Sequence, residues 1–219
     1  MLTFNDVKNH PAIRTYIEKG NAVLGELGFT EHGFAHAGIT AEMAADILTA
    51  LGYGPRTVEL ARIAGFIHDI GNCVNRVDHA QSGALMAFTL LSAMGMEPDE
   101  LSEVAGAIGN HDEGTGQAIS PISAALILAD KSDVRRSRVR SRRTIGIDIH
   151  DRVNYAVMDS RLQVDTKRGE VLLSLTIDTD ISAVMDYFEI FLSRMLMCRK
   201  AAEYLGLHFG LLINQNRLL

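Results

Sequence analysis

The sequence predicts a mainly α-helical bundle followed by a small C-terminal β-β-α-β unit. Through the first two-thirds of the 219 residues, apolar side chains recur every three to four positions, as on the buried face of a helix. The connections between these segments are short, as in antiparallel bundles. After about residue 145 the apolar period falls to two, which is typical of strands. We therefore expect two units, a helical domain over residues 1–145 and an α+β subdomain over residues 146–219.

The predicted helices begin and end at residues with known capping preferences. Asn5 or Asp6 can cap a first helix that runs to about Leu27 and ends at Gly28. Proline is favoured at the first position of a helix, and three later segments begin with one. The five further helices are expected at about residues 34–51, 55–71, 79–93, 98–109 and 121–137.

A hairpin, a helix and a last strand are expected in the second unit. VNYAVMDSRLQVD (153–165) alternates, EVLLSLTID (170–178) is rich in Val, Leu, Ile and Thr, and TKRG between them is a suitable hairpin loop. A long amphipathic helix is expected from about Ile181 to Leu205, with HFGLLIN (208–214) as the returning strand. We expect this Met-rich helix to pack on the hairpin, or on a second copy of the chain in a homodimer.

Composition indicates a cytoplasmic globular protein without a membrane partner. The chain is 47% hydrophobic, and no apolar run reaches the roughly 20 residues of a membrane span. The N-terminal residues lack the basic and apolar regions of a signal peptide. Cys73 and Cys198 are too few for a disulfide framework, which fits a reducing compartment.

Positive charge is concentrated in one short block. The chain has a formal net charge of -6, whereas residues 131–143 hold seven basic residues and one acidic residue, a net +6. The remaining residues therefore sum to -12. A basic block on an acidic chain is a local feature, so it does not imply general attraction to nucleic acid.

Histidines and acids with metal-ligand chemistry fall on successive predicted helices. In chain order they are His36, the adjacent His68 and Asp69, His79, His111 and Asp130. A single histidine is more often hydrogen-bonded or solvated than a metal ligand, but side chains from facing helices can converge on one cation. Asp130, flanked by ALILA, is expected to face inward and to need a partner. That partner is a metal, Lys131, Arg135 or a helix N-terminus.

This ordered set resembles the HD domain, a helical superfamily of metal-dependent phosphohydrolases named for its His-Asp pair. The matching stretches, HGFAHAGIT, FIHDIG, HAQSG, AIGNHDE and LILADKSD, cover roughly residues 32–135. The resemblance implies one metal held by His36, His68, Asp69 and Asp130. It implies a second metal that Asp69 bridges and that His79 and His111 hold, which makes Asp69, His79 and His111 the catalytic residues. His32 is expected beside the site without being a ligand.

The resemblance implies hydrolysis of a nucleotide or another small phosphate ester by attack of a metal-bound hydroxide. Mixed imidazole and carboxylate ligands suit one or two ions of Mn, Fe, Co, Ni or Zn per chain. The HD-GYP phosphodiesterases carry Lys after HDIG, then His-His-Glu and Gly-Tyr-Pro. Here Asn72 and Asn110 stand at two of these positions and no Gly-Tyr-Pro follows, which argues against cyclic-di-GMP as the substrate.

The basic block is expected to contact substrate phosphate at its near end. If the sixth helix continues, Lys131, Arg135, Arg138 and Arg142 form one stripe that begins beside Asp130. Arg binds phosphate through two parallel hydrogen bonds. The alternative for residues 138–143 is a solvated helix end. Contact with nucleic acid is a third and weaker interpretation, because no aromatic residues lie among the basic ones to stack on bases.

Two other functions stay open. Some HD-fold proteins use a di-iron centre, with the same order of ligands, to cleave C–C or C–P bonds as oxygenases. A non-catalytic module that binds a nucleotide or nucleic acid is the third hypothesis. Retention of every candidate ligand position argues against the binding module, because binding alone would not need them.

Overall fold

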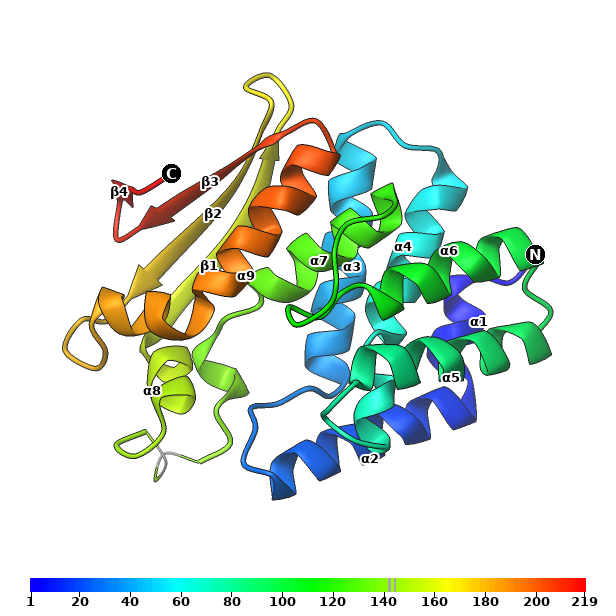
Figure 1. Ribbon diagram of the computed structural model, residues 1–219, viewed down its shortest axis with the longest axis horizontal. Coiled ribbons are helices and arrows are strands. Elements are labelled where there is room, and N and C mark those ends of the chain that lie inside the picture. Colours follow the sequence, from blue (N-terminus) through cyan, green and yellow to red (C-terminus); the bar gives the residue numbers. More distant parts are fainter. Residues whose placement is uncertain (142, 144) are drawn as a thin grey trace.

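The computed structural model describes residues 1–141, 143 and 145–219. It has a mainly helical body with a small sheet at its C-terminal end, as expected (Figure 1). The helices of the body are α1 (Phe4–Asn9), α2 (Pro11–Glu26), α3 (Phe34–Ala50), α4 (Pro55–Ile67), α5 (His79–Ala93), α6 (Pro98–Gly109) and α7 (Pro121–Ser132). The second unit contains α8 (Ile149–Ala156), β1 (Val157–Asp165), β2 (Glu170–Ile177), α9 (Val184–Tyr204), β3 (His208–Ile213) and β4 (Asn216–Arg217).

The expectation of one continuous first helix is wrong, because the chain breaks at Pro11. α1 is capped by Thr3, whose hydroxyl accepts a hydrogen bond from the backbone N–H of Asp6 while the Asp6 carboxylate accepts one from the Thr3 N–H. Proline has no N–H to continue α1 and instead starts α2. Gly28 follows the end of α2 with φ of 82°, as a glycine stop requires.

Two further helices end earlier than the apolar pattern predicts. α4 stops at Ile67, and the His-Asp pair that follows leads into a 3-10 turn over Ile70–Cys73. α7 stops at Ser132, and a second 3-10 turn spans Arg136–Arg138. The basic block therefore does not continue α7, so the prediction that its basic residues form one helical stripe is wrong. Arg142 lies outside the described residues.

The sheet has the expected β-β-α-β arrangement with one addition, β4. Within the described chain the strand order is β1-β2-β3-β4, and only the β2–β3 pair is parallel. That parallel pair requires a crossover, which α9 supplies. The predicted first strand is four residues too long, because residues 153–156 belong to α8. The Asp148 side chain caps that helix by accepting a hydrogen bond from the Asp151 N–H at 2.9 Å.

α7 is the central element of the core. Its Leu126, Ile127 and Leu128 have no exposed surface, and α7 packs against α3, α4, α6 and α9. α9 lies between α7 and the sheet, so Leu173 of β2 joins the same apolar cluster (Figure 1). Because α7 touches so many elements, residues near its C-terminal end lie within reach of side chains from several helices.

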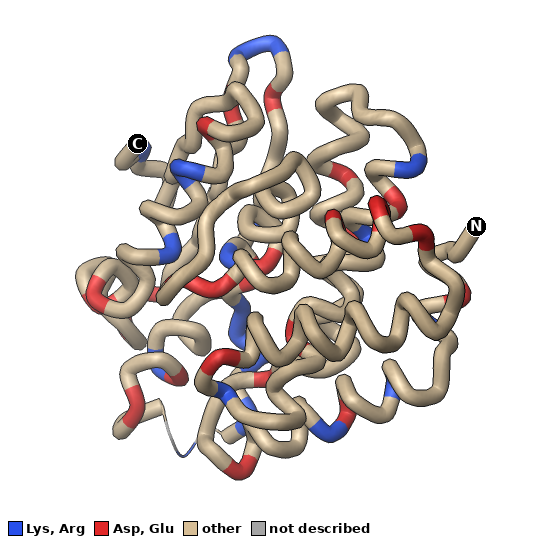
Figure 2. Tube along the Cα trace, turned by 45° about the vertical axis from the view of Figure 1, so that its right-hand side comes forward, with Lys and Arg blue, Asp and Glu red and all other residues tan. Residues whose placement is uncertain are grey.

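Charged positions are intermixed rather than segregated. In the view of Figure 2, Lys and Arg positions lie at the hairpin, along the helices and near the centre, interleaved with Asp and Glu. No helix in the described part of the chain combines the length and the apolar character that crossing a membrane requires.

Candidate metal centre

The structure brings the predicted ligand set together at one place in the helical body. His36 lies in the first turn of α3, His79 is the first residue of α5, and Asp130 lies in the last turn of α7. The remaining members follow the ends of helices: His68 and Asp69 after α4, and His111 after α6. The four imidazole rings follow one another in the order His36, His68, His111 and His79. The centroids of neighbouring rings are 5.0–5.1 Å apart.

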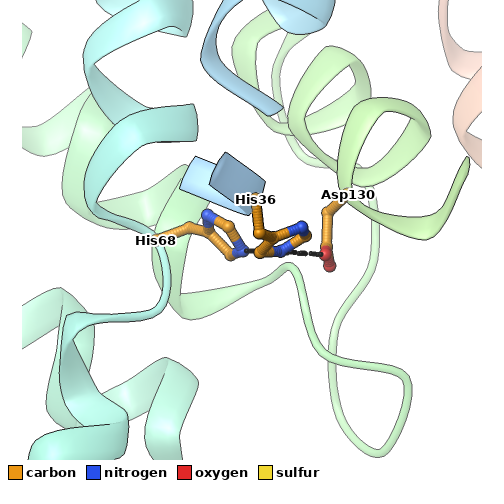
Figure 3. Close-up of side chains that lie close together, drawn as sticks. All are labelled: His36, His68 and Asp130. Atoms are coloured by element: carbon orange, nitrogen blue, oxygen red, sulfur yellow. Dashed lines mark hydrogen bonds and ion pairs between the residues drawn. The ribbon is translucent and has the colours of Figure 1, made fainter. Parts of the chain in front are cut away.

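One group of donor atoms is formed by His36, His68 and Asp130 (Figure 3). Nε2 of His36 lies 3.2 Å from Nε2 of His68 and 3.2 Å from Oδ1 of Asp130. Two nitrogen ligands, each about 2.1 Å from an ion and at right angles, stand roughly 3 Å apart. The spacing therefore fits ligands that share one ion.

The two carboxylate oxygens of Asp69 face two different pairs of histidines. Oδ2 lies 3.4 Å from Nε2 of His68 and 3.7 Å from Nε2 of His36. Oδ1 lies 3.5 Å from Nε2 of His79 and 3.9 Å from Nε2 of His111. Each oxygen of this carboxylate therefore lies within 4 Å of a different pair of imidazole nitrogens.

Every histidine of the set turns Nε2 to the centre and has its Nδ1 occupied by an acceptor. Three of these acceptors are backbone carbonyl oxygens: Gly65 for His68 at 2.8 Å, Arg76 for His79 at 3.0 Å and Ile108 for His111 at 2.6 Å. A carbonyl oxygen can only accept, so Nδ1 of each of these three rings carries a proton, and Nε2 is the nitrogen that has the lone pair whenever the ring is neutral. That is the tautomer a metal ligand needs.

The fourth histidine, His36, has a side chain as its acceptor. Its Nδ1 lies 2.7 Å from Oδ2 of Asp133, whose side chain is 4% exposed. Sequence reasoning missed Asp133, although it is the second aspartate of the motif LILADKSD. Carboxylates commonly orient metal-binding histidines in this way.

Burial and neighbouring charges tune the centre. Burial raises the pKa of the Asp69 carboxyl, whereas the neighbouring His68 lowers it. The net pKa is well below the usual range. The same holds for Asp130, where Lys131 is the main opposing charge. Burial lowers the pKa of His111 to about 3, which keeps this imidazole neutral. His68 differs, because the effect of burial is outweighed by Asp69 and Asp130, which raise its pKa to about 10. The centre thus combines ionised carboxylates with imidazole rings, and these two ligand types suit divalent transition metals.

A close backbone approach holds α5 against the His-Asp turn. A Cβ at Gly71 would overlap the carbonyl oxygen of His79 and lie 2.5 Å from the backbone nitrogen of Gly83. Only glycine allows this contact. The turn after the His-Asp pair therefore places His79 beside Asp69.

The three basic residues predicted to bind phosphate do not lie together in the structure. Lys131 is 5% exposed, with Nζ 2.7 Å from Oδ2 of Asp130, and Arg138 is buried and donates to the carbonyl oxygen of Asp133 at 2.7 Å. Both line the cavity at the centre. Arg135 instead binds the Asp133 carboxylate and lines a separate cavity of about 530 Å³ beside α3 and β1.

The cavity at the centre shares part of its wall with a larger one. The smaller cavity is bounded by residues of the donor set together with Arg76, Lys131 and Arg194. The larger has a volume of about 340 Å³, and both share His32, Arg76, Arg138 and Arg194 in their walls. Besides His36, His68 and Asp130, a second group of converging donor atoms in the described chain is His68, Asp69 and His111, and His32 and His79 belong to neither group. Sequence reasoning missed Arg76, which lies between two of the family motifs, and Arg194, for which no sequence signal exists.

Comparisons with known proteins bear on this arrangement. The family model of the HD domain matches residues 31–156, more than half of the chain. An uncharacterized protein of Methanocaldococcus jannaschii is 25% identical over 161 residues, which cover 64% of this chain and 62% of the relative. This chain thus aligns with less than two thirds of that relative's length.

A solved structure, described as a predicted HD superfamily hydrolase from an uncultured Thermotogales bacterium, is 27% identical with a TM-score of 0.45. The similarity covers 57% of this chain and 68% of that chain. All the converging histidines and aspartates lie inside the segment that the family model matches, whereas Arg194 lies outside it.

Proposed function

Because this chain belongs to the HD domain family, we propose that it is a metal-dependent phosphohydrolase acting on a small phosphate ester such as a nucleotide. The observation that carries the proposal is the position of Asp69, whose two oxygens face separate histidine pairs. Two ions held close together by a shared carboxylate are typical of enzymes that transfer phosphoryl groups. In this proposal residues 1–145 form the phosphohydrolase domain and residues 146–219 a smaller C-terminal subdomain.

The proposed metal ligands divide into two groups around Asp69. His36, His68 and Asp130 hold one divalent ion together with one Asp69 oxygen. His79 and His111 hold a second ion with the other oxygen. Mn, Fe, Co, Ni and Zn suit this mixture of imidazole and carboxylate, whereas Mg and Ca prefer oxygen ligands.

Divalent ions bound here would supply Lewis acidity that neutralises phosphate charge and makes a water molecule acidic. The protein's own contribution is charge and orientation. Asp69, His79 and His111 border the small cavity beside which the phosphate group would bind. Lys131 and Arg138 border the same cavity and bind the phosphate oxygens. Arg138 is already oriented, because the carbonyl oxygens of Glu31 and Asp133 accept its hydrogen bonds at 2.9 and 2.7 Å. Arg135 is not part of the proposed phosphate site.

Metal content and hydrolysis, measured on one preparation, test the proposal. Protein purified without chelator is analysed for transition metals, and hydrolysis of 4-nitrophenyl phosphate is assayed before and after adding Mn²⁺ or Ni²⁺. We expect about two ions per chain and hydrolysis that the added metal stimulates. Asp69→Ala should abolish both with helix content unchanged, and full activity in that variant would overturn the assignment.

The alternatives give different results in the same experiment. Bound iron without hydrolysis would favour the oxygenase chemistry that a centre with the same ligand order supports. No bound metal, and no gain on adding any, would leave a non-catalytic binding module as the better hypothesis.

A further inference from the structure

The wall of the larger cavity is built partly by the C-terminal unit. Asp148 and Asn154 come from the start and the body of α8, and Phe191 and Arg194 come from α9. α9 begins at residue 184, beyond the segment that the HD family model matches. A helix that the family model does not include therefore reaches the candidate metal centre.

Arg194 is held in position before any ligand arrives. Its Nε lies 2.6 Å from Oε1 of Glu113, and its guanidinium lies over the ring of Phe191, 4.4 Å from the centroid. Glu113 in turn lies 3.5 Å from Nζ of Lys131, which connects α9 to the residue next to Asp130. A guanidinium carries five N–H donors, and the contact with Glu113 uses only one edge of the group.

Four cationic side chains line one or both of the two neighbouring cavities. Arg76, Arg138 and Arg194 line both cavities, and Lys131 lines the smaller one. Arg76 rests on an aromatic ring as Arg194 does, with its guanidinium 5.6 Å from the centroid of Phe29. Carboxylates pair with three of these cations: Asp130 and Glu113 with Lys131, Glu113 with Arg194, and Asp133 with Arg138. A guanidinium group keeps further N–H donors beyond those that one ion pair uses, and such donors suit a phosphate group.

The rest of the larger cavity has a different character. Its volume of about 340 Å³ is at the lower end of the range for small-molecule sites, roughly 300–1,000 Å³. Leu27 and Phe29 contribute apolar surface, whereas Thr30, Asp148 and Asn154 contribute oxygen atoms that can accept hydrogen bonds. A small molecule that is partly apolar and carries hydroxyl or amino groups matches this lining.

We propose that the C-terminal unit completes the substrate site: Arg194 of α9 binds the phosphate of a small phosphate monoester, and the cavity between α8 and the α2–α3 connection takes its organic half, which carries hydroxyl or amino groups. This inference rests on the proposed function, because the phosphate lies at the centre where hydrolysis would occur. It gives residues 146–219 a role in selecting the substrate.

Phosphate binding to the metal-loaded protein tests the role of Arg194 without turnover. Affinity for inorganic phosphate is measured by calorimetry for the wild type, Arg194→Gln and Arg199→Gln. Arg199 is the matched control, because it lies on the same helix, is about half exposed and forms an ion pair with Glu203 at 4.0 Å. Loss of one charge-assisted phosphate contact should weaken binding roughly 10- to 100-fold in Arg194→Gln, whereas Arg199→Gln should change it less than about twofold.

Two further variants separate binding from folding. Arg194→Lys keeps the charge but loses the planar fork, so it should restore part of the affinity. Arg194→Gln combined with Glu113→Gln removes the carboxylate that the single change leaves unpaired, and should still bind phosphate weakly. Circular dichroism and metal content are checked for each variant. Equal phosphate affinity in Arg194→Gln and Arg199→Gln would overturn the role of Arg194.

The organic half is tested with two phosphate monoesters, ribose 5-phosphate and phenyl phosphate. We expect kcat/KM to be at least about tenfold higher for the hydroxylated ester, since each hydrogen bond to an uncharged group contributes up to a factor of about ten. Asn154→Leu should reduce this preference and leave the affinity for inorganic phosphate unchanged. A preference for phenyl phosphate would overturn this part of the inference.

The outcomes distinguish the inference from the proposed function. Phosphate binding that depends on Arg194 in a protein that hydrolyses neither ester would reject the phosphohydrolase and retain the anion site. Hydrolysis that is unaffected in Arg194→Gln would retain the phosphohydrolase and reject the role of α9.

Discussion

The carboxylate of Asp133 connects His36 to Arg135. One oxygen accepts a hydrogen bond from Nδ1 of His36 at 2.7 Å, and the other accepts one from Nε of Arg135 at 2.7 Å. Burial raises the pKa of Asp133, whereas the hydrogen bond from His36 lowers it. The net pKa lies below the usual value, so the group stays ionised. An ionised partner fixes the orientation of the imidazole and makes its Nε2 a stronger donor.

We therefore expect Asp133→Asn to weaken metal binding. The amide keeps the shape but removes the charge that faces His36, and loss of such a partner typically costs 10- to 100-fold in metal affinity. Competition with a chromophoric chelator measures the effect. Arg135→Gln removes the hydrogen bond to the second oxygen of Asp133 and should have a smaller effect. Asp159→Asn, which changes a half-exposed side chain on β1, is the charge control, and equal affinities in all three variants would contradict the role of Asp133.

Asp69→Asn should reduce the number of bound ions, because its two oxygens serve both histidine pairs. The amide offers one oxygen and one NH2 group, and the NH2 group cannot bind a cation. Elemental analysis after dialysis is expected to find at most one ion where the wild type retains about two. The matched control is Asp46→Asn on the exposed side of α3. Retention of both ions by Asp69→Asn would show that the carboxylate does not bridge.

Removing the metal should lower the thermal stability of the folded protein. An ion that binds only the native state stabilises it by about 2.7 kcal/mol at a free concentration 100 times its Kd. For a chain of this size that corresponds to a Tm increase of roughly 5–10 °C. Differential scanning calorimetry with and without Mn²⁺ measures the shift. Asp69→Asn should show a smaller shift, and an identical shift in both proteins would place the stabilising ion elsewhere.

Gly71→Ala is expected to disturb the centre through the backbone. The added Cβ would overlap the His79 carbonyl, so α5 must move or the turn must open, at a cost of about 1–3 kcal/mol. Gly38→Ala is the matched control on α3, where a Cβ meets nothing within 4 Å. That change should be neutral or stabilising by up to about 1 kcal/mol. Urea unfolding compares the two variants, and an undiminished midpoint for Gly71→Ala would contradict the tight contact.

Most of the helices could be predicted from the sequence because their boundaries are local. α5 begins at His79 and ends at Ala93 as expected, and glycines with positive φ close α2 and α3. The errors also have local causes that periodicity does not reveal. Apolar spacing continues through Pro11, through His68 and Asp69, and past Ser132, but backbone geometry ends the helix at each point.

The order of histidines and aspartates along the chain determined which residues to expect at a metal centre, and the structure brings that whole set together. It could not show Asp133 as the partner of His36, because the two are separated by 97 positions. The order of residues also could not show that Arg138 lines the cavity at the centre whereas Arg135 does not. That difference depends on where α7 ends and how the chain turns afterwards.

The sequence by itself thus determined the types of the elements and the chemical identity of the donor set, since periodicity, caps and ligand types are properties of neighbouring residues. Only the tertiary structure decided which oxygen of Asp69 faces which histidines. It likewise decided which nitrogen of each imidazole faces the centre. It also decided that Arg194, far along the chain, reaches the same cavity as Arg76. These relationships arise from packing between distant segments, which α7 organises by contacting both the helical body and α9.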